Sequence, residues 1–293
     1  MLTVGMPCYD DFNGVYFSVQ TLRLYHPKVK IVVVDNNPDS EDGKATKKFV
    51  ESWGRNNCQY VPFGKFKSPA VKNLVFKHAE TPYVLCMDCH VLLEKGALEG
   101  LIEYYKANPD TKDLIQGPLL YDDLKQVSTH MDPVWRGQMW GIWATDERGK
   151  DKDAEPFEIP MQGMGLFSCR KDAWLGFNKY FRGFGGEEGY IHEKFRQDGR
   201  KIMCLPFLRW IHRFERPRGV PYPLDTIAKF RNYLIGFAEL GLDIEPLVEH
   251  FREHMPQNKI DQCIERVREM RDHIGGKAGQ FGESGIYKPH PPL

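Results

Sequence analysis

The sequence predicts an α/β protein with a mostly parallel central sheet flanked by helices, and with a helical C-terminal extension. Three observations predict this fold class. Short apolar segments alternate with segments of helical periodicity through roughly the first 120 residues. Beyond Asp225 the periodicity is helical only. The chain has 293 residues, 41% of them hydrophobic, which suffices for one large domain or two modest ones.

The first part of the chain is predicted to form successive βαβ units, in which each apolar segment runs into a polar loop and then a helix. The predicted strands are residues 3–7, 30–35, 58–63 and 81–88, and the predicted helices are residues 14–25, 44–54 and 68–80. Ligands of such sheets bind at the carboxyl ends of the strands. Asp10, Asp35 and Asp88 follow three of these ends and are therefore candidate site residues.

The second part of the chain is less regular. Residues 122–160 are polar, rich in tryptophan and poor in periodicity, so we interpret them as a long functional loop. Around this segment we predict a helix at 96–109, a strand at 113–121, a short strand after the glycine-rich MQGMG, a helix at 185–199, a strand at 201–214, and helices after Asp225.

The composition excludes several classes of protein. Forty basic and forty acidic residues give no net charge, so no basic field marks the chain as a nucleic-acid or anionic-membrane binder. No segment has the length and apolar character of a signal peptide or membrane span, and we expect a cytoplasmic protein. Seven cysteines, scattered through predicted strands and loops, favour reduced thiols over a disulfide framework.

One segment, YVLCMDCHVLL, allows two interpretations. Its C-x-x-C-H spacing matches a c-type haem attachment signature. Side chains of an extended strand alternate between faces, however, which places Cys86, Asp88 and His90 on one face and Cys89 on the other. The two cysteines then cannot share one haem edge or one zinc ion, and a C-x-x-C disulfide needs a helix start. Strand context therefore favours Asp88 and His90 as the functional pair.

An Asp-x-His pair at a strand end has the chemistry of a divalent metal site. The carboxylate suits Mn²⁺ or Mg²⁺, and the imidazole shifts the preference toward Mn²⁺ or a later metal. The alternative is structural: Asp88 caps the following helix and His90 packs in the core.

Taken in order, the segments VVVDNN, AETPYVLCMDCHVLLEKGALEGLI, MQGMGLFSCRKDAW, FGGEEGYIHEKFRQDG and LPFLRWIHRF resemble those of family 2 type glycosyltransferases. The resemblance is closest to polypeptide N-acetylgalactosaminyltransferases and galactosyltransferase-like domains, and it covers roughly residues 1–215. It implies a nucleotide-diphospho-sugar transferase (glycosyltransferase A-type) fold. We expect a catalytic domain at residues 1–220, a helical extension packed on it at 221–275, and a loosely ordered tail at 276–293.

The resemblance also implies a metal site and a donor. Asp88 and His90 would be the Asp-x-His metal motif, and His212 would be the third protein ligand. His212 taken alone would be read as a core histidine. The implied cofactor is Mn²⁺, or Mg²⁺, and the donor is a nucleotide sugar, expected to be a UDP-sugar. A bound Mn²⁺ would neutralise the charge that develops on the leaving diphosphate.

Donor contacts are implied mainly at the first two strand ends, near the metal strand and in the tryptophan and glycine segments. Asp35 or Asp10 could accept the N3–H of uracil. Trp135, Trp140 and Trp143 offer faces for sugars, although core packing accounts for at least one of them. The residues implied to bind the donor are Pro7, Tyr9, Asp10, Asp35, Asn36, Lys72, Asn73, Asp88, Trp140, Trp143 and Gly163.

The segment FGGEEGY supplies the implied catalytic residues, Glu187 and Glu188. Glu188 stands where inverting relatives have a catalytic Asp and where retaining N-acetylgalactosaminyltransferases have Asn, so we lean toward inversion with Glu188 as general base. A retaining transferase, or a binding protein for nucleotide sugars or glycans without turnover, is the alternative. The two glutamates could also merely complement the helix dipole. The acceptor could be a glycan, a protein or another hydroxyl compound, a nucleic-acid base is not excluded, and the oligomeric state stays open.

Overall fold

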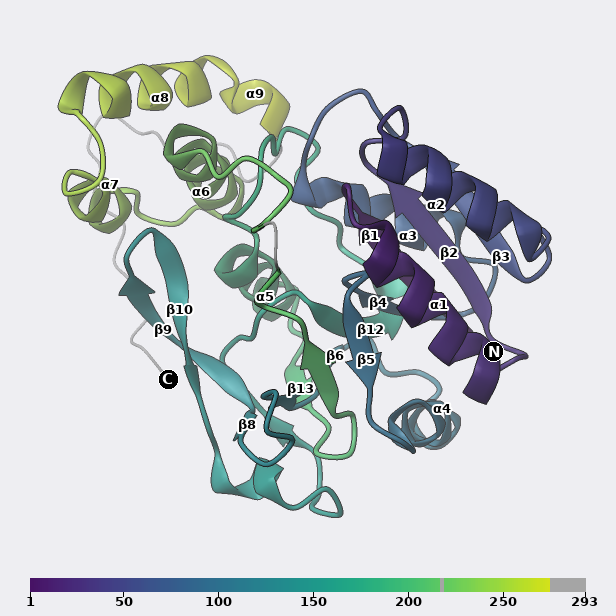
Figure 1. Ribbon diagram of the computed structural model, residues 1–293. Coiled ribbons are helices and arrows are strands. Elements are labelled where there is room, and N and C mark those ends of the chain that lie inside the picture. The colour runs from purple at the N-terminus through teal and green to yellow at the C-terminus, as the bar shows by residue number, and fades with distance from the viewer. Residues whose placement is uncertain (217–218, 275–293) are drawn as a thin grey trace.

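A mixed sheet forms the centre of the computed structural model, which describes residues 1–216 and 219–274 (Figure 1). Its strands lie in the order β11–β13–β6–β12–β4–β1–β2–β3. All neighbours pair in parallel except β12, which is antiparallel to β4 and β6, and the edge strand β11. The strands are β1 (Leu2–Cys8), β2 (Lys30–Asp35), β3 (Cys58–Pro62), β4 (Tyr83–Met87), β6 (Leu114–Gln116), β11 (Phe157–Glu158), β12 (Leu166–Arg170) and β13 (Ile202–Cys204). The predicted mostly parallel sheet is confirmed.

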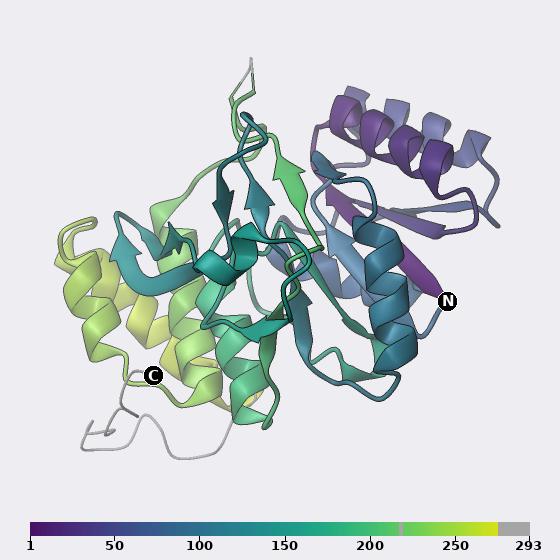
Figure 2. The ribbon, with the colours of Figure 1, turned by 90° about the horizontal axis from the view of Figure 1, so that it is seen from below.

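Helices cover both faces of this sheet, as Figure 2 shows for the N-terminal half. On one face, residues of α1, α2 and α4 share a buried core with Ile31 and Val33. On the other face, residues of α3 and α5 share a second core with Val32 and Val34. Successive side chains of β2 thus enter two different cores. Because both faces of the sheet are buried, the central strands are continuous apolar runs. These helices are α1 (Phe12–Tyr25), α2 (Glu41–Ser52), α3 (Lys72–His78), which follows the 3-10 turn Pro69–Val71, α4 (Ala97–Ala107) and α5 (Glu188–Gln197).

Two strands expected to be continuous are each divided between two sheets. A second sheet has the order β5–β14–β7–β8. The expected strand 113–121 breaks at Gly117–Pro118, where any side chain on Gly117 would collide with the backbone of Leu208. The expected strand 201–214 breaks at a turn that includes Pro206, which cannot donate to a strand ladder. The strands of the second sheet are β5 (Val91–Leu93), β7 (Leu119–Leu120), β8 (Val127–Ser128) and β14 (Trp210–His212).

The segment 122–160, expected to be a long loop, contains four strands. It contains β8, the hairpin of β9 (His130–Arg136) and β10 (Met139–Ala144), a 3-10 turn at Glu147–Lys150, and β11. A bulge between Trp140 and Ile142 shifts the register of the hairpin. The bulge and the interspersed glycines obscure the period-2 alternation, which explains why the hairpin was not predicted.

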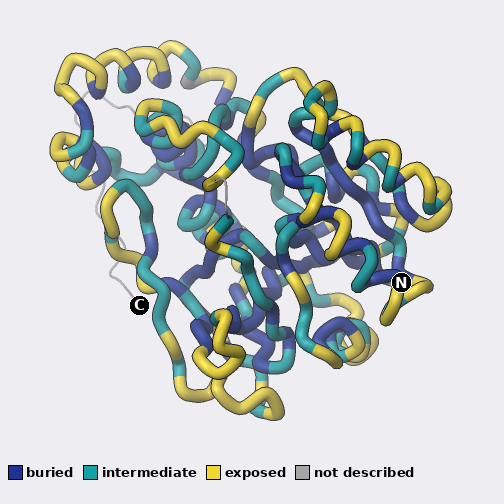
Figure 3. The backbone as a smooth tube through the Cα atoms, in the orientation of Figure 1, coloured by how far each residue is buried: buried dark blue, intermediate teal, exposed yellow. Residues whose placement is uncertain are grey.

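The C-terminal part of the described chain is helical, as predicted. It comprises α6 (Thr226–Leu240), α7 (Glu245–Phe251), α8 (Gln257–Glu269) and α9 (Arg271–Ile274). Asp225 caps α6 by accepting a hydrogen bond from the backbone of Ile227. Figure 3 shows α8 exposed on its outer side and buried toward α6.

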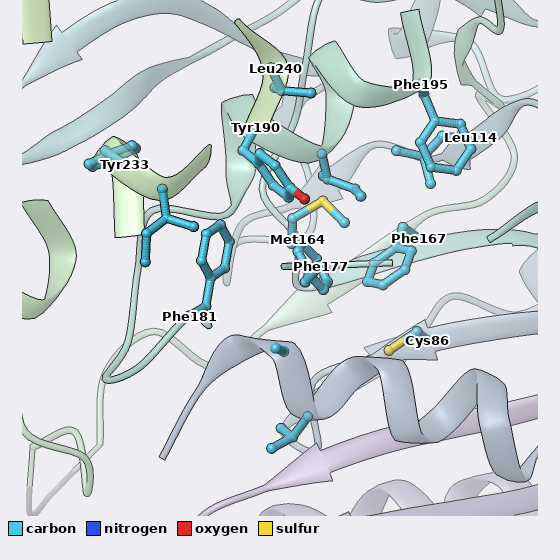
Figure 4. Packing of buried hydrophobic residues seen from close by; sticks show 14 of the residues in the cluster. Cys86, Leu114, Met164, Phe167, Phe177, Phe181, Tyr190, Phe195, Tyr233 and Leu240 are labelled. Carbon is cyan, nitrogen blue, oxygen red and sulfur yellow. The ribbon is translucent and has the colours of Figure 1, made fainter. Parts of the chain in front are cut away.

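The apolar face of α6 lies in the same core as α5. Phe230 and Tyr233 belong to one buried cluster with Phe181 and Tyr190, part of which is drawn in Figure 4. The rings of Phe181 and Tyr190 are 5.0 Å apart in an edge-to-face arrangement. The domain boundary at residue 220 stays a prediction, and the expected tail at 276–293 lies outside the described residues.

Within the described residues, no helix has the length and apolar character required to cross a bilayer. All seven cysteines are buried and free, as the scattered spacing predicts. The compartment stays a prediction.

Candidate active site

A cavity of about 430 Å³ opens at the carboxyl ends of β1, β2 and β4. This volume is within the range of small-molecule sites. The residues predicted to bind the donor, the metal and the acceptor reach it from distant parts of the chain. Those that line it are Pro7, Tyr9, Asn36, Lys72, Asp88, His90, Trp143, Gly163, Glu187, Glu188 and His212.

Asp88, His90 and His212 converge at the base of this cavity. Asp88 follows β4 directly, and β5 and β14 are paired so that His212 lies opposite Val91, next to His90. The Nε2 atoms of the two histidines are 3.1 Å apart, and His212 Nε2 lies 3.7 Å from Asp88 Oδ2. Ligands about 2.1 Å from an octahedral ion are separated by roughly 3 Å, so this set fits a divalent metal. The mixture of nitrogen and oxygen donors suits Mn²⁺.

The alternation of side chains along a strand accounts only in part for the placement of Asp88 and His90. β4 ends at Met87, so the alternation of a strand does not extend to His90. Turn geometry and the pairing of β5 with β14 bring the residues together instead. Cys89 Sγ lies 3.6 Å from His90 Nδ1 and is therefore not remote from the site. Cys86 and Cys89 nevertheless belong to core clusters on opposite faces of the sheet, which excludes a shared haem or zinc ion.

Asp11 orients His90, and the sequence alone did not identify it. Its carboxylate lies 3.1 Å from His90 Nδ1 and accepts two hydrogen bonds from Arg213, at 2.8 and 3.0 Å. A carboxylate on Nδ1–H leaves the Nε2 lone pair directed toward a metal. Burial acts to raise the pKa of Asp11, but hydrogen bonds from His90, Gly14 and Arg213 hold it well below the ordinary value. Arg216 also donates to His90, 2.6 Å from Nε2.

Lys72 contacts Asp88 of the metal motif. Its ammonium group lies 3.5 Å from Asp88 Oδ1 and donates a 2.8 Å hydrogen bond to the carbonyl of Met164. Burial alone would raise the pKa of Asp88, but the charge of Lys72 and the neighbouring His212 lower it well below the ordinary value. Asp88 is therefore held ionised, which is the form that binds a metal.

Glu187 and Glu188 begin α5 and line the cavity. Gly185 and Gly186 precede them with φ angles of 93° and 88°, a conformation that glycine adopts without strain. One carboxylate oxygen of each glutamate is buried and has no hydrogen-bond partner among residues 1–216 and 219–274. Burial and mutual repulsion raise the pKa of Glu187, and burial raises that of Glu188, while the charge of Lys72 opposes both shifts. Such carboxyl groups are suited to proton transfer near neutral pH.

A buried histidine connects this helix to the glycine-rich turn and was also missed by the sequence interpretation. His192 contacts the carbonyl of Glu188 through Nδ1 and accepts a hydrogen bond from the backbone of Gln162, at 3.2 Å. Gln116 lies 2.9 Å from the same ring and donates to the carbonyl of Gly163. Burial lowers the pKa of His192 to about 3, so the ring is neutral and can accept the hydrogen bond from the backbone of Gln162.

Four of the predicted donor-binding residues are outside the cavity lining. Asp35 accepts hydrogen bonds from Tyr60 Oη and the backbone of Asn37, and Asp10 accepts from the side chain of Asn37. Neither carboxylate faces the cavity in this structure, because both serve the turn after β2. Asn73 fixes the loop before α5 by bonding to Trp174 and Phe177.

Of the three tryptophans considered as sugar contacts, one lines the cavity and two do not. Trp143 lines the cavity and packs on Gly163, where an added Cβ would lie 2.9 Å from the indole ring. Trp140 packs on Gly189 instead, outside the cavity lining. Trp135 stacks on His250 at a ring distance of 4.4 Å. Only Trp143 of these three is therefore placed to contact a ligand in the cavity.

Solved structures share this fold at low sequence identity. GalNAc-T7 with UDP, GalNAc and Mn²⁺ superposes with a TM-score of 0.66 at 15% identity, over 93% of this chain and 54% of that one. The mannosyltransferase PcManGT from Pyrobaculum calidifontis, in complex with GDP-Man and Mn²⁺, gives 0.52 at 12% identity, over 93% and 70%. The chain thus spans about half the length of GalNAc-T7. These likenesses confirm the glycosyltransferase A-type fold.

The sequence itself has a family match. No curated protein matches the chain significantly. The model of the family described as glycosyl transferase family 2 matches residues 3–173, which is more than half of the chain. The chain therefore belongs to glycosyl transferase family 2.

Proposed function

We propose that this enzyme transfers a sugar from a UDP-sugar to a hydroxyl acceptor with inversion, using Mn²⁺ and Glu188 as general base. One observation carries the proposal. Three metal-ligand atoms lie within 4.8 Å of one another in the cavity that also holds two buried carboxylate oxygens, for which the described residues provide no hydrogen-bond partner. A metal site for a diphosphate next to a free base is the arrangement that glycosyl transfer from a nucleotide sugar requires.

Asp88, His90 and His212 would hold the metal, with Asp11 orienting His90 and Lys72 keeping Asp88 ionised. When bound, Mn²⁺ acts as a Lewis acid that stabilises the negative charge on the leaving diphosphate. Arg216, which donates to His90 Nε2 in this structure, would have to release that nitrogen for the metal.

The nucleoside would bind over Pro7, Tyr9 and Asn36. The Tyr9 ring lies in the cavity wall, where a base could stack on it, and its other neighbours are Phe184 and Lys67. The preference for UDP rests on the resemblance to polypeptide N-acetylgalactosaminyltransferases. Asp10 and Asp35 face the turn after β2, so neither is placed here to accept the uracil N3–H.

Glu188 would take the proton from the acceptor hydroxyl as its oxygen attacks the anomeric carbon and the bond to the diphosphate breaks. Attack on the face opposite the leaving group inverts the anomeric configuration. Glu187, also in the cavity, would accept hydrogen bonds from hydroxyl groups of the donor sugar or the acceptor.

A donor-hydrolysis screen tests the proposal. Purified protein would be incubated with UDP-, GDP- and dTDP-sugars, with and without Mn²⁺, and nucleotide release would be measured. We expect Mn²⁺-stimulated release from a UDP-sugar. No stimulated release from any donor would contradict the transferase mechanism, and release from GDP-sugars alone would contradict the UDP assignment. The anomeric configuration of the first product, determined by NMR, then separates inversion from retention, and only inversion agrees with Glu188 as base.

A further inference from the structure

The wall of the cavity opposite the donor strands comes from the β9–β10 hairpin and from the segment that leads into α6. Strand β10 of the hairpin and helix α6 itself both contact α5, the helix that begins with Glu188 (Figure 1). The hairpin contributes Met131, Met139 and Trp143 to the wall, and an apolar surface of this kind suits a ring or hydrocarbon face. A ligand on this wall would lie on the acceptor side of Glu188.

Two further cationic side chains, Arg136 and Lys229, line this wall. Lys72 and Arg216, which also line the cavity, are engaged by Asp88 and Asp11 respectively. Arg136 of β9 and Lys229 of α6 make neither an ion pair nor a hydrogen bond with any part of the chain that the structure describes. The cavity therefore holds, on its acceptor side, two positive charges that no salt bridge or hydrogen bond of the described residues engages.

The position of Lys229 places one of these charges next to the base. Its side chain packs over Gly185, so closely that a Cβ on the glycine would lie 2.8 Å from Lys229 Cε. Gly185 is three residues before Glu188, and the charge of Lys229 favours the ionised form of that glutamate. An anionic group bound by Lys229 would thus lie beside the attacking hydroxyl.

We propose that the acceptor is an anionic hydroxyl compound, whose carboxylate or phosphate is bound by Arg136 and Lys229. The inference rests on the proposed function, because it assigns the acceptor of that same site. The donor diphosphate would be matched by the metal on the opposite side of the cavity, which leaves this cationic pair for a second anion. Arginine presents a planar fork of donors that fits carboxylate and phosphate oxygens, and lysine adds a mobile point charge.

Matched pairs of probes test this assignment without knowledge of the natural acceptor. Phenyl glucuronide against phenyl glucoside probes a carboxylate, and glucose 6-phosphate against glucose probes a phosphate. Each would be titrated by ligand-observed NMR into the 293-residue protein with UDP and with Mg²⁺, which avoids the paramagnetic broadening that Mn²⁺ causes. We expect the charged member of at least one pair to bind about tenfold more tightly than the neutral one, and the pair that responds identifies the anion.

The preference should disappear in the Arg136→Gln/Lys229→Gln double variant, while the weak affinity for the neutral members stays the same. Lys47→Gln, which removes an exposed lysine on α2 outside the cavity, is the matched control and should keep the preference. Equal affinity within both pairs, including no binding by any probe, would overturn the proposal. A preference that survives in the double variant would also overturn it.

The donor-hydrolysis screen keeps this inference distinct from the proposed function. Mn²⁺-stimulated hydrolysis without an anion preference would refute the anionic acceptor and leave the transferase mechanism standing. An anion preference without hydrolysis of any donor would refute the proposed function and confirm an anion site on this wall.

Discussion

Replacing Glu188 by glutamine removes the proposed base and leaves the shape of the site intact. A general base contributes about 10²- to 10⁴-fold to the rate, which corresponds to about 3–5 kcal/mol of activation free energy. We therefore expect Glu188→Gln to lower kcat for transfer, and for donor hydrolysis by water, by this factor. Donor KM and Mn²⁺ affinity should change little, because Glu188 is not among the metal-ligand set.

The structure also predicts the effect of this substitution on stability. One oxygen of the Glu188 carboxylate is buried without a partner, and the group repels Glu187. Glutamine removes that repulsion and breaks no ion pair within the described residues, so the melting temperature should stay the same or rise. A catalytic loss with an unchanged or higher Tm would separate a chemical role from damage to the fold.

The control lies on the same helix. Glu193→Gln changes the same group five residues later, where the carboxylate pairs with Arg196 outside the cavity. It should keep at least half of the activity. Steady-state kinetics with the donor found by screening provides the assay for both variants. If Glu188→Gln kept more than about a tenth of the wild-type kcat, the assignment of Glu188 as base would be wrong.

Three further predictions concern the metal, the cysteines and pH. His212→Ala should weaken Mn²⁺ binding at least tenfold by calorimetry, and unchanged affinity would remove His212 from the ligand set. The Cys86→Ala/Cys89→Ala variant should lose about 1–3 kcal/mol of unfolding free energy for each buried thiol but keep its metal affinity; loss of the metal would return the cysteines to the site. Burial raises the pKa of Glu188 above the ordinary 4.5. The rate of transfer should therefore fall as the pH is lowered through this raised pKa, because the base becomes protonated. The free energy of unfolding should fall as the pH rises from about 4.5 through the raised pKa, because the unfolded chain loses this proton first. Lys229→Gln removes a charge that lowers this pKa and should move the acidic limb of the pH–rate profile to higher pH, whereas an unmoved limb would place the titration elsewhere.

The elements with strong local signals could be predicted from the sequence. The first two strands are largely apolar runs buried on both faces, and α6 has a capping Asp225 and a terminal Gly241. Such signals come from the segment itself, so no knowledge of its neighbours is needed.

Elements that depend on distant partners could not be predicted. The segment from residue 201 to 214 is mostly apolar, yet its halves pair with β6 and β5 in different sheets. The β9–β10 hairpin packs Trp135 on α7, and nothing in the local pattern distinguishes that ring from Trp143 in the cavity. Apolarity indicates burial, but it does not specify which surface provides it.

Site residues with a local sequence signal could likewise be predicted, and those defined by distant partners could not. Asp88 and Glu188 stand in segments whose residue types resemble a known pattern. Asp11 was missed because its visible local role, capping α1 through the backbone of Gly14, is a complete explanation of an aspartate before a helix. Its second role depends on His90 and on Arg213, which is 202 residues away in the chain. His192 was missed because a histidine inside an amphipathic helix gives no local sign of its partners.

The metal site formed by Asp88, His90 and His212 can be tested directly by a crystal structure of the protein with Mn²⁺ and UDP, with anomalous scattering measured at the manganese edge. We predict one anomalous peak within about 2.3 Å of Asp88, of Nε2 of His90 and of Nε2 of His212, with Arg216 displaced from His90 and diphosphate oxygens completing the coordination. A peak at Asp11, Cys89 and His90, or no peak in this cavity, would contradict the proposed metal ligands and the proposed metal-dependent transfer.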